Sequence, residues 1–307
     1  MSVHTARQNH LRQKYGSWAV VTGASSGIGR EIASQLAEAG LNLILIARRQ
    51  ELLDEIAAGF VARHGVEARV VRADLATSAG VAAAILSSRN LDVGLFVAAA
   101  GFGTAGSLLR SDLAQEFEML DVNCRTLLAL SSHFGRRFSE QGRGGMIFMA
   151  SLVGWQGVPY CAHYAATKAY VQSLAEGLHV ELKPRGVDVL ASAPGPVRSG
   201  FATRSGMRMS AALTPADVAS ATVDALGRRM TVVPGALSKL LTYSLVPLPR
   251  PLRVRMMGRI MRGMTKHLES VPPDPKIANA HRLSGELPPD VSDRLPRYRN
   301  QRERREP

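Results

Sequence analysis

The stretch from Trp18 to Gly40, WAVVTGASSGIGREIASQLAEAG, combines an apolar strand, a glycine-rich turn and a helix in direct succession. Its first four residues have the apolar character of a buried strand, and the segment that ends at Gly40 has the composition of a helix. Glycines at such a turn let the backbone approach phosphate oxygens, and the start of the helix offers free N–H groups and a partial positive charge. We therefore expect this turn to bind a nucleotide through Gly23, Ser25, Ser26, Gly27, Ile28 and Gly29.

The alternation of strand and helix continues along the chain. Strands are expected near residues 18–22, 41–47, 68–72, 93–99, 144–150, 187–193 and 231–234. Helices are expected near residues 27–39, 50–64, 77–88, 112–138, 164–182 and 215–228, the last with Thr214 as its cap. Apolar strands that alternate with helices predict an α/β protein with a doubly wound parallel sheet, the Rossmann fold.

The composition divides the 307 residues into one folded domain and charged ends. Residues 16–235 form the predicted domain, and about 220 residues are enough for an ample core. Residues 1–15 are expected to form a basic tail, 236–270 an amphipathic helical extension, and 271–307, rich in proline and arginine, a disordered tail. Because +10 of the net charge of +13 lies in the two ends, basicity says little about the domain.

The second strand ends in two arginines, Arg48 and Arg49. In dinucleotide-binding folds the residue at this point meets the adenosine ribose, where an acid suits the 2′-hydroxyl of NAD and a base accepts the 2′-phosphate of NADP. The alternative is a pair of solvated arginines at a strand end. Because neither residue is an acid, the sequence favours NADP(H) over NAD(H).

A second functional pattern lies in the stretch from Ser151 to Lys168. Tyr164 and Lys168 are four residues apart in a predicted helix, so that their side chains share one face. At about 4 Å and an effective dielectric of about 20, a lysine cation stabilises a phenolate by about 4 kcal/mol. We therefore expect Lys168 to lower the pKa of Tyr164 from its ordinary value of about 10 into the range useful for acid–base catalysis. The Ser151 hydroxyl is expected to hold a substrate carbonyl near the phenol.

Taken together, the motifs resemble the short-chain dehydrogenase/reductase family of the single-domain type, over about residues 16–235. Thr22–Gly29 is similar to the TGxxxGxG turn of the family, and Ser151, Tyr164 and Lys168 are similar to its serine, tyrosine and lysine. Asn123 matches the catalytic asparagine of the family. The resemblance therefore implies four catalytic residues, namely Asn123, Ser151, Tyr164 and Lys168.

Further cofactor contacts are implied by the same resemblance. Asp74 and Leu75 match the pair that holds the adenine ring, and the segment 194–199 matches the PGxVxT motif that holds the nicotinamide carboxamide. Lys168 would also hold the nicotinamide ribose, and Asn123 would keep a chain of water to this lysine. The remaining cofactor-binding residues implied by the resemblance are Ala100, Gly101, Tyr164, Pro194, Gly195, Val197 and Ser199.

Two positions depart from the family pattern. Ala98-Ala99-Ala100-Gly101 stands where the family has NNAG, so the asparagine side chain that would brace the sheet is absent. Ser199 stands in place of threonine and keeps the hydroxyl. Both departures leave the expected chemistry intact: NADP(H)-dependent interconversion of a carbonyl and a secondary alcohol. An NADP preference favours reduction in a cell rich in NADPH.

The substrate is expected to be lipophilic, such as a fatty acyl, steroid-like or other hydrophobic ketone. Residues 200–209 occupy the position of the substrate lid of the family and contain Phe201, Met207 and Met209. The loop 152–161 adds Trp155 and other apolar residues. Cys161 either lines the site or is a small packed residue. His163 precedes Tyr164 and is expected to point away from the Tyr164–Lys168 face.

The segment 250–268 has the pattern of an amphipathic helix. Arginines and a lysine gather on one side, and Met257, Ile260, Met261 and Met264 gather on the other. One interpretation packs the apolar side on the domain or on a second subunit. The other lays the helix on an anionic membrane surface as a peripheral contact. No apolar stretch reaches the ~20 residues needed to span a bilayer.

Two alternatives to an enzyme stay open at this stage. One is a regulatory protein that binds NADP without turnover, which the presence of all four catalytic residues disfavours. The other is a nucleic-acid binder that uses the basic ends, but no aromatic platform or helix-turn-helix pattern accompanies them. No metal-ligand pattern occurs, and the two cysteines, Cys124 and Cys161, suit a reducing cytoplasm. The resemblance further implies a homo-oligomer, a dimer or tetramer.

Overall fold

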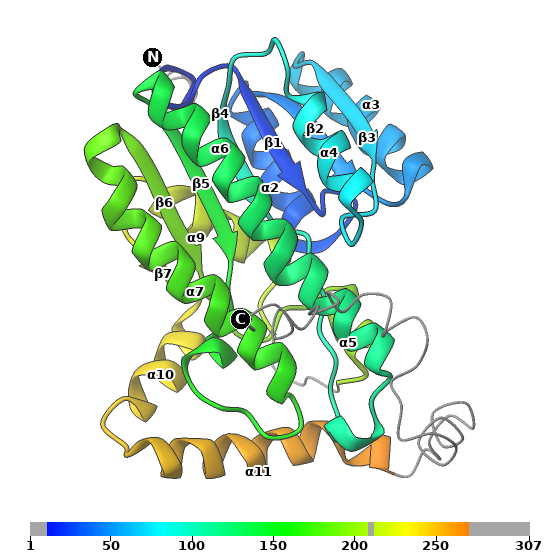
Figure 1. Ribbon diagram of the computed structural model, residues 1–307, viewed down its shortest axis with the longest axis vertical. Helices are drawn as coiled ribbons and strands as arrows, with labels where there is room; N and C mark the ends of the chain where they lie inside the picture. The colour runs from blue at the N-terminus through cyan, green and yellow to red at the C-terminus, as the bar shows by residue number, and fades with distance from the viewer. Residues whose placement is uncertain (1–10, 208–211, 270–307) are drawn as a thin grey trace, which may run out of the picture.

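The computed structural model of the protein describes residues 11–207 and 212–269 (Figure 1). Its centre is a seven-stranded sheet in which every neighbouring pair of strands runs parallel. The spatial order is β3-β2-β1-β4-β5-β6-β7, which changes direction between β1 and β4. Ligands of open parallel sheets bind outside the carboxyl ends of the strands at such a switch point. The predicted doubly wound sheet is confirmed.

Each strand begins within one residue of its predicted start. The strands are β1 (Trp18–Thr22), β2 (Asn42–Ala47), β3 (Ala68–Arg72), β4 (Val93–Ala98), β5 (Gly144–Met149), β6 (Val187–Ser192) and β7 (Thr231–Val232). The central strands β1, β5 and β6 are buried along their whole length. Their continuous apolar sequences follow from this position, because helices cover both faces of a parallel sheet.

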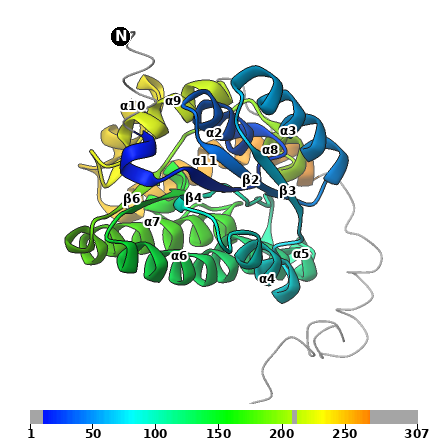
Figure 2. The ribbon, with the colours of Figure 1, turned by 90° about the horizontal axis from the view of Figure 1, so that it is seen from above.

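Helices form one layer on each side of the sheet, as the view from above shows (Figure 2). The helices are α2 (Gly27–Glu38), α3 (Gln50–His64), α4 (Ser78–Ser87), α5 (Leu113–Leu120), α6 (Leu127–Gln141), α7 (Ala162–Leu182), α8 (Gly200–Ser205), α9 (Pro215–Ala225), α10 (Ala236–Leu245) and α11 (Arg250–Glu269). Short 3₁₀ turns cover Leu108–Arg110, Leu152–Trp155 and Lys183–Arg185. Helices α2, α3 and α9 lie on one face, and α4, α6 and α7 lie on the other (Figure 2).

Each face of the sheet has its own apolar core. On the side of α6, the rings of Phe96 in β4 and Phe134 in α6 stack with centroids 4.7 Å apart, and Phe138 continues the row. Such aromatic pairs add to the free energy gained by burying their apolar area. The two cores hold the carboxyl ends of the strands in a fixed arrangement, on which the functional site is built.

The helix predicted over residues 112–138 is interrupted by a π-helical turn, Asp121–Thr126, between α5 and α6. The prediction of one continuous α-helix is wrong at this point, where the Asn123 side chain bonds to segments far away in the sequence. Asn123 Nδ2 donates to the Phe102 carbonyl oxygen at 2.9 Å and to Thr167 Oγ1 at 3.0 Å. A π turn inside a helix often marks a functional position.

The N-terminal tail is shorter than the sequence suggests, because residues 11–15 are helical. Tyr15 is almost fully buried, and its hydroxyl donates to Asp188 Oδ2 at 2.9 Å. Lys14 and Lys183 form ion pairs with the same carboxylate, at 2.6 and 2.7 Å. These contacts to β6 tie the segment to the domain. The rest of the predicted tail, and the predicted tail at 271–307, lie outside the described residues.

Helix α9 starts with the predicted cap. The backbone N–H of Asp217 donates to Thr214 Oγ1 at 3.1 Å, and the Thr214 backbone N–H donates to Asp217 Oδ2 at 3.2 Å, which completes a capping box. We expect Thr214→Ala to lower the free energy of unfolding in urea by about 1 kcal/mol, while Thr214→Ser keeps the acceptor and most of the stability. Equal losses in the two variants would mean that the cap contributes little.

After β7 the chain turns below the carboxyl ends of the strands and forms α10 and α11 (Figure 1). The buried residues of α11 include Met257, Met261 and Thr265, which face the domain, and Arg262 donates two hydrogen bonds to Tyr160 Oη. The segment predicted as a helix over 250–268 is helical here as α11. Its packing on the domain or on a second subunit, or its contact with a membrane surface, stays a prediction. Within the described ranges, no helix is both long and apolar enough to cross a bilayer.

Candidate active site

A cavity of about 720 Å³ opens at the carboxyl ends of the strands. It brings together residues from the glycine-rich turn, the ends of β2, β4 and β5, helix α7 and the segment that follows β6. Of the residues predicted for the site, those in its wall are Gly23, Ser25, Ser26, Gly27, Ile28, Gly29, Arg48, Arg49, Asp74, Leu75, Ala100, Gly101, Ser151, Tyr164, Lys168, Pro194, Gly195, Val197 and Ser199. Asn123 alone among the predicted residues is not part of the wall and lies behind it.

The glycine-rich turn has the geometry that a dinucleotide requires. Gly23 has a left-handed φ of +68°, and a Cβ there would lie 2.8 Å from the main chain of Ala99 and Ala100, so only glycine fits. Ser26 caps α2 without a side-chain hydrogen bond, and the first turn of α2 carries no acidic residue. The N–H groups and the positive end of the helix dipole therefore face the cavity. These residues fit a bound pyrophosphate.

A threonine supplies the brace that the missing asparagine would provide. Thr22 Oγ1 accepts hydrogen bonds from the backbone N–H groups of Ala99 at 3.1 Å and Ala100 at 3.2 Å, and it donates to the Val97 carbonyl oxygen at 3.2 Å. The end of β1 is thereby fixed to the end of β4. The alanines at 98–100 leave the sheet intact here, because the bracing group sits on the neighbouring strand.

The two arginines after β2 are held by different partners. Arg49 donates to Ser25 Oγ in the glycine-rich turn at 2.9 Å. Arg48 forms an ion pair with Glu118 of α5 at 3.0 Å, and Arg204 of α8 approaches the same carboxylate oxygen at 3.7 Å. All four charged residues line the cavity. The sequence analysis misses Glu118 and Arg204, since only the fold brings α5 and α8 to the end of β2.

Three of the four residues predicted to be catalytic, Ser151, Tyr164 and Lys168, line the cavity together. Tyr164 is 8% exposed, and the Ser151 side chain lies beside its hydroxyl. Ser151 Oγ also accepts from the backbone N–H of Val153 at 3.4 Å, which fixes its rotamer. Lys168 Nζ donates to the Met149 carbonyl oxygen at 2.7 Å and lies 5.7 Å from the centre of the Tyr164 ring. The phenol and the ammonium group therefore lie side by side in the cavity wall.

The predicted lowering of the Tyr164 pKa is wrong for this structure. Burial, and then the nearby Cys161, raise the pKa of the Tyr164 phenol, and the Ser151 side chain only partly opposes the rise. Burial lowers the pKa of Lys168 to about 8. Both shifts have one cause, since desolvation disfavours a phenolate and an ammonium ion alike. A phenol that keeps its proton suits donation to a carbonyl, which is the reductive direction.

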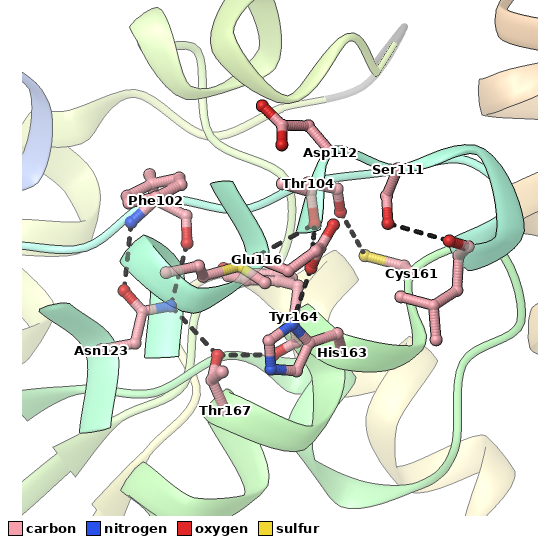
Figure 3. A network of polar contacts seen from close by, with 12 residues as sticks. Phe102, Thr104, Ser111, Asp112, Glu116, Asn123, Cys161, His163, Tyr164 and Thr167 are labelled. Atoms are coloured by element: carbon pink, nitrogen blue, oxygen red, sulfur yellow. Dashed lines mark hydrogen bonds and ion pairs between the residues drawn. The ribbon is translucent and has the colours of Figure 1, made fainter. Parts of the chain in front are cut away.

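Asn123 fixes the chain segment that forms the floor of the cavity (Figure 3). Its Oδ1 accepts from the Phe102 backbone N–H at 3.2 Å, and its Nδ2 donates to the Phe102 carbonyl oxygen and to Thr167 Oγ1. Thr167 Oγ1 in turn donates to the Tyr164 carbonyl oxygen at 2.8 Å. The amide therefore joins the end of β4 to the helix that carries the tyrosine. Asn123 is itself 3% exposed.

The other half of the cavity is apolar and lies beyond Tyr164. Phe201 of α8 packs on the Tyr164 ring, with centroids 5.3 Å apart. Trp155 of the predicted loop lines the same space and contacts Tyr243 of α10 edge-on. The far wall comes from α10 and α11, through Leu241, Leu245, Met256, Met257, Ile260, Met261 and Met264. The amphipathic pattern of α11 is visible in the sequence, but its place in the cavity wall is not.

The side chains next to Tyr164 have distinct positions (Figure 3). Cys161 is buried, lines the cavity and contacts the Thr104 carbonyl oxygen at 3.5 Å. Burial, and then the nearby Glu116 carboxylate, raise the pKa of its thiol to about 12, which makes it inert at neutral pH. His163 points out of the cavity and pairs with Glu116 at 2.6 Å, as its place in the helix predicts.

Comparison with known proteins agrees with this site. Residues 17–209 match the model of the short chain dehydrogenase family. A 7beta-hydroxysteroid dehydrogenase of Clostridium sardiniense is 34% identical over 234 residues, which make up 75% of this chain and 90% of that protein.

Solved structures show the same likeness. A structure that concerns 7beta-hydroxysteroid dehydrogenase stereoselectivity matches with a TM-score of 0.75 and 27% identity, over 80% of this chain and 98% of that chain. A short-chain dehydrogenase from Sphingobium yanoikuyae in complex with NADPH matches with a TM-score of 0.70 and 28% identity, over 76% and 94% of the two chains. The chain therefore belongs to the short-chain dehydrogenase/reductase family of oxidoreductases, which act on hydroxyl and carbonyl groups with a nicotinamide cofactor.

Proposed function

We propose that the protein is an NADP(H)-dependent ketoreductase that interconverts a carbonyl and a secondary alcohol on a lipophilic substrate. The observation that carries this proposal is the division of one cavity into two halves that meet at Tyr164. One half holds the glycine-rich turn and the arginines after β2, and the other has an apolar wall rich in methionine. The complex of the Sphingobium yanoikuyae relative with NADPH supports the choice of cofactor.

In the proposed reaction a bound NADPH supplies the hydride. The Ser151 hydroxyl hydrogen-bonds the carbonyl oxygen of the substrate and keeps it beside the phenol. Tyr164 gives its proton to this oxygen as the alcohol forms. The Lys168 ammonium group then stabilises the phenolate by its charge, and its pKa of about 8 leaves it mostly protonated at neutral pH.

The apolar half sets the class of substrate. Methionine side chains are flexible and polarizable, so a wall built from them adapts to the shape of an apolar ligand. Apolar walls with a few polar groups near the reacting atoms are usual in sites for small lipophilic molecules. The names of the relatives, which include hydroxysteroid dehydrogenases, support a bulky ketone of this kind.

The test is the oxidation of NADPH, followed by absorbance, with a panel of ketones matched in reactivity. The panel holds steroid ketones, a 3-oxoacyl thioester and a short ketone such as acetone. We expect kcat/KM to rise by at least about 10-fold from the short ketone to the bulky ones, because about 0.8 kcal/mol is gained for each buried methylene group. A panel in which acetone is the best substrate would rule out the lipophilic class.

Two further outcomes address the alternatives to an enzyme. Tight binding of NADPH without turnover of any ketone or alcohol would favour the regulatory protein. In a mobility-shift assay, binding of DNA that persists from low salt to 0.2 M salt would favour the nucleic-acid binder. Binding through the basic ends alone weakens steeply with salt. The proposed function requires turnover and does not require binding to DNA.

A further inference from the structure

Helix α8 of the lid carries a charged residue to the end of the cavity where the adenosine half of the cofactor is expected. Arg204 lines the cavity together with Arg48, Arg49 and Asp74. Burial, and then the nearby Arg48 cation, lower the pKa of Arg204, while Glu118 and Asp74 oppose this shift. The Arg204 guanidinium therefore lies within electrostatic range of the groups that follow β2 and β3.

The position of Arg204 is fixed by an aromatic platform. Its guanidinium carbon lies 4.1 Å from the centre of the Phe102 ring, a distance typical of stacking and of cation–π contact. Phe102 is 3% exposed, and Asn123 binds both its backbone N–H and its carbonyl oxygen (Figure 3). The catalytic asparagine thus holds the surface on which the lid arginine rests.

One carboxylate is shared between the two arginines. Glu118 Oε1 lies 3.0 Å from Arg48 Nη1 and 3.7 Å from Arg204 Nη2. One negative charge therefore stands between two positive charges, and Arg49 adds a third cation at the same end of the cavity. A phosphate group with its higher charge can accept hydrogen bonds from both guanidinium groups.

The same short helix also contacts the catalytic tyrosine. Phe201, three residues before Arg204, packs on the Tyr164 ring at 5.3 Å. A Cβ on Gly103 would lie 2.7 Å from Phe201 Cζ and 2.8 Å from Tyr164 Cδ2, so the two rings fill the space above the main chain at residue 103. Because Arg204 and Phe201 share one short helix, a displacement of α8 moves both the guanidinium group and the ring that packs on Tyr164.

We propose that Arg204 binds the 2′-phosphate of NADP(H) together with Arg48, and that this contact holds α8 closed over Tyr164. The inference rests on the proposed preference for NADP(H). The 2′-phosphate then contributes to turnover as well as to affinity, because its contact with Arg204 keeps α8 packed over Tyr164. With NADH the lid keeps only the Phe102 stacking and the pair with Glu118.

The first experiment measures binding without turnover. Adenosine 2′,5′-bisphosphate and 5′-AMP differ only by the 2′-phosphate, and calorimetry gives the dissociation constant of each for the whole protein. We expect Arg204→Gln to weaken the binding of the bisphosphate by about 10-fold and to leave the dissociation constant of 5′-AMP within about twofold of the wild-type value, since the variant loses a charge-assisted hydrogen bond to the 2′-phosphate. Arg136→Gln is the matched control, because Arg136 of α6 is exposed and outside the cavity wall. Glu118→Gln removes the carboxylate that competes for the two arginines, and we expect it to tighten the binding of the bisphosphate.

The second experiment measures ketone reduction with NADPH and with NADH. We expect Arg204→Gln to lower kcat with NADPH to near the value with NADH, and Arg204→Lys to restore part of it because the charge remains. Equal losses of kcat with the two cofactors, with bisphosphate binding unchanged, would show that Arg204 only packs the lid and would overturn the inference. If the wild type binds the bisphosphate no better than 5′-AMP, the NADP(H) preference fails as well, which separates the two failures.

Discussion

Replacing Tyr164 with phenylalanine is expected to lower kcat for ketone reduction by about 100-fold or more, while NADPH still binds. The substitution removes the hydroxyl and leaves the ring packed against Phe201. General acid catalysis contributes about 10²–10⁴-fold to a rate, and the loss of the donor forfeits this factor. Stopped-flow absorbance of the chemical step and fluorescence titration of NADPH measure the two quantities separately.

A matched control lies on the same helix. Tyr170 is exposed and outside the cavity, so Tyr170→Phe makes the same chemical change away from the site. We expect this variant to keep kcat and the dissociation constant of NADPH within about twofold of the wild-type values, as surface substitutions usually do. If Tyr164→Phe retained near-normal turnover, the proton would have to come from another group and the proposed mechanism would fail.

Replacing Arg48 with aspartate is expected to weaken NADPH binding by about 10- to 100-fold and NADH binding by less than about threefold. The aspartate loses a charge-assisted hydrogen bond to the 2′-phosphate and adds a repulsive charge beside Glu118. NADH has no phosphate at this position and keeps its other contacts. The measurement is the ratio of the two dissociation constants in the variant and in the wild type.

The control for this variant is another arginine at the end of a neighbouring strand. Arg72 ends β3, is exposed and does not line the cavity. Arg72→Asp makes the same change in charge, and we expect the ratio to stay near the wild-type value. If Arg48→Asp weakened the binding of NADPH and NADH equally, Arg48 would not bind the 2′-phosphate. The NADP(H) preference would then have another source or would not exist.

The sequence predicts the sheet closely because its signals are local. Apolar runs such as Leu43–Ile46 are buried on both sides, and the glycine at position 23 is required by its own backbone conformation. The capping box at Thr214 needs only residues within one turn. For the same reason, most of the cofactor half of the site can be read from short motifs that follow the ends of strands.

Features that depend on distant segments are the ones the sequence analysis misses. The π turn at Asp121–Thr126 accompanies hydrogen bonds from Asn123 to residues 102 and 167. The direction of the Tyr164 pKa shift is wrong in the sequence analysis because the argument considers Lys168 on the same helix and omits burial by the rest of the fold. Glu118 and Arg204 approach Arg48 only after three separate elements have packed together.

The position of α11 has a consequence for the order in which the site is assembled during synthesis. Every residue of the glycine-rich turn, and Tyr164 and Lys168 as well, precedes α9 in the chain, whereas the methionine wall comes from α11. Domains generally fold as units, the N-terminal ones first, while the chain is synthesised at about 5–20 residues per second. A nascent chain that has emerged as far as β7 contains the residues of the cofactor cleft but lacks those of the far wall, which α11 can supply only after its own synthesis.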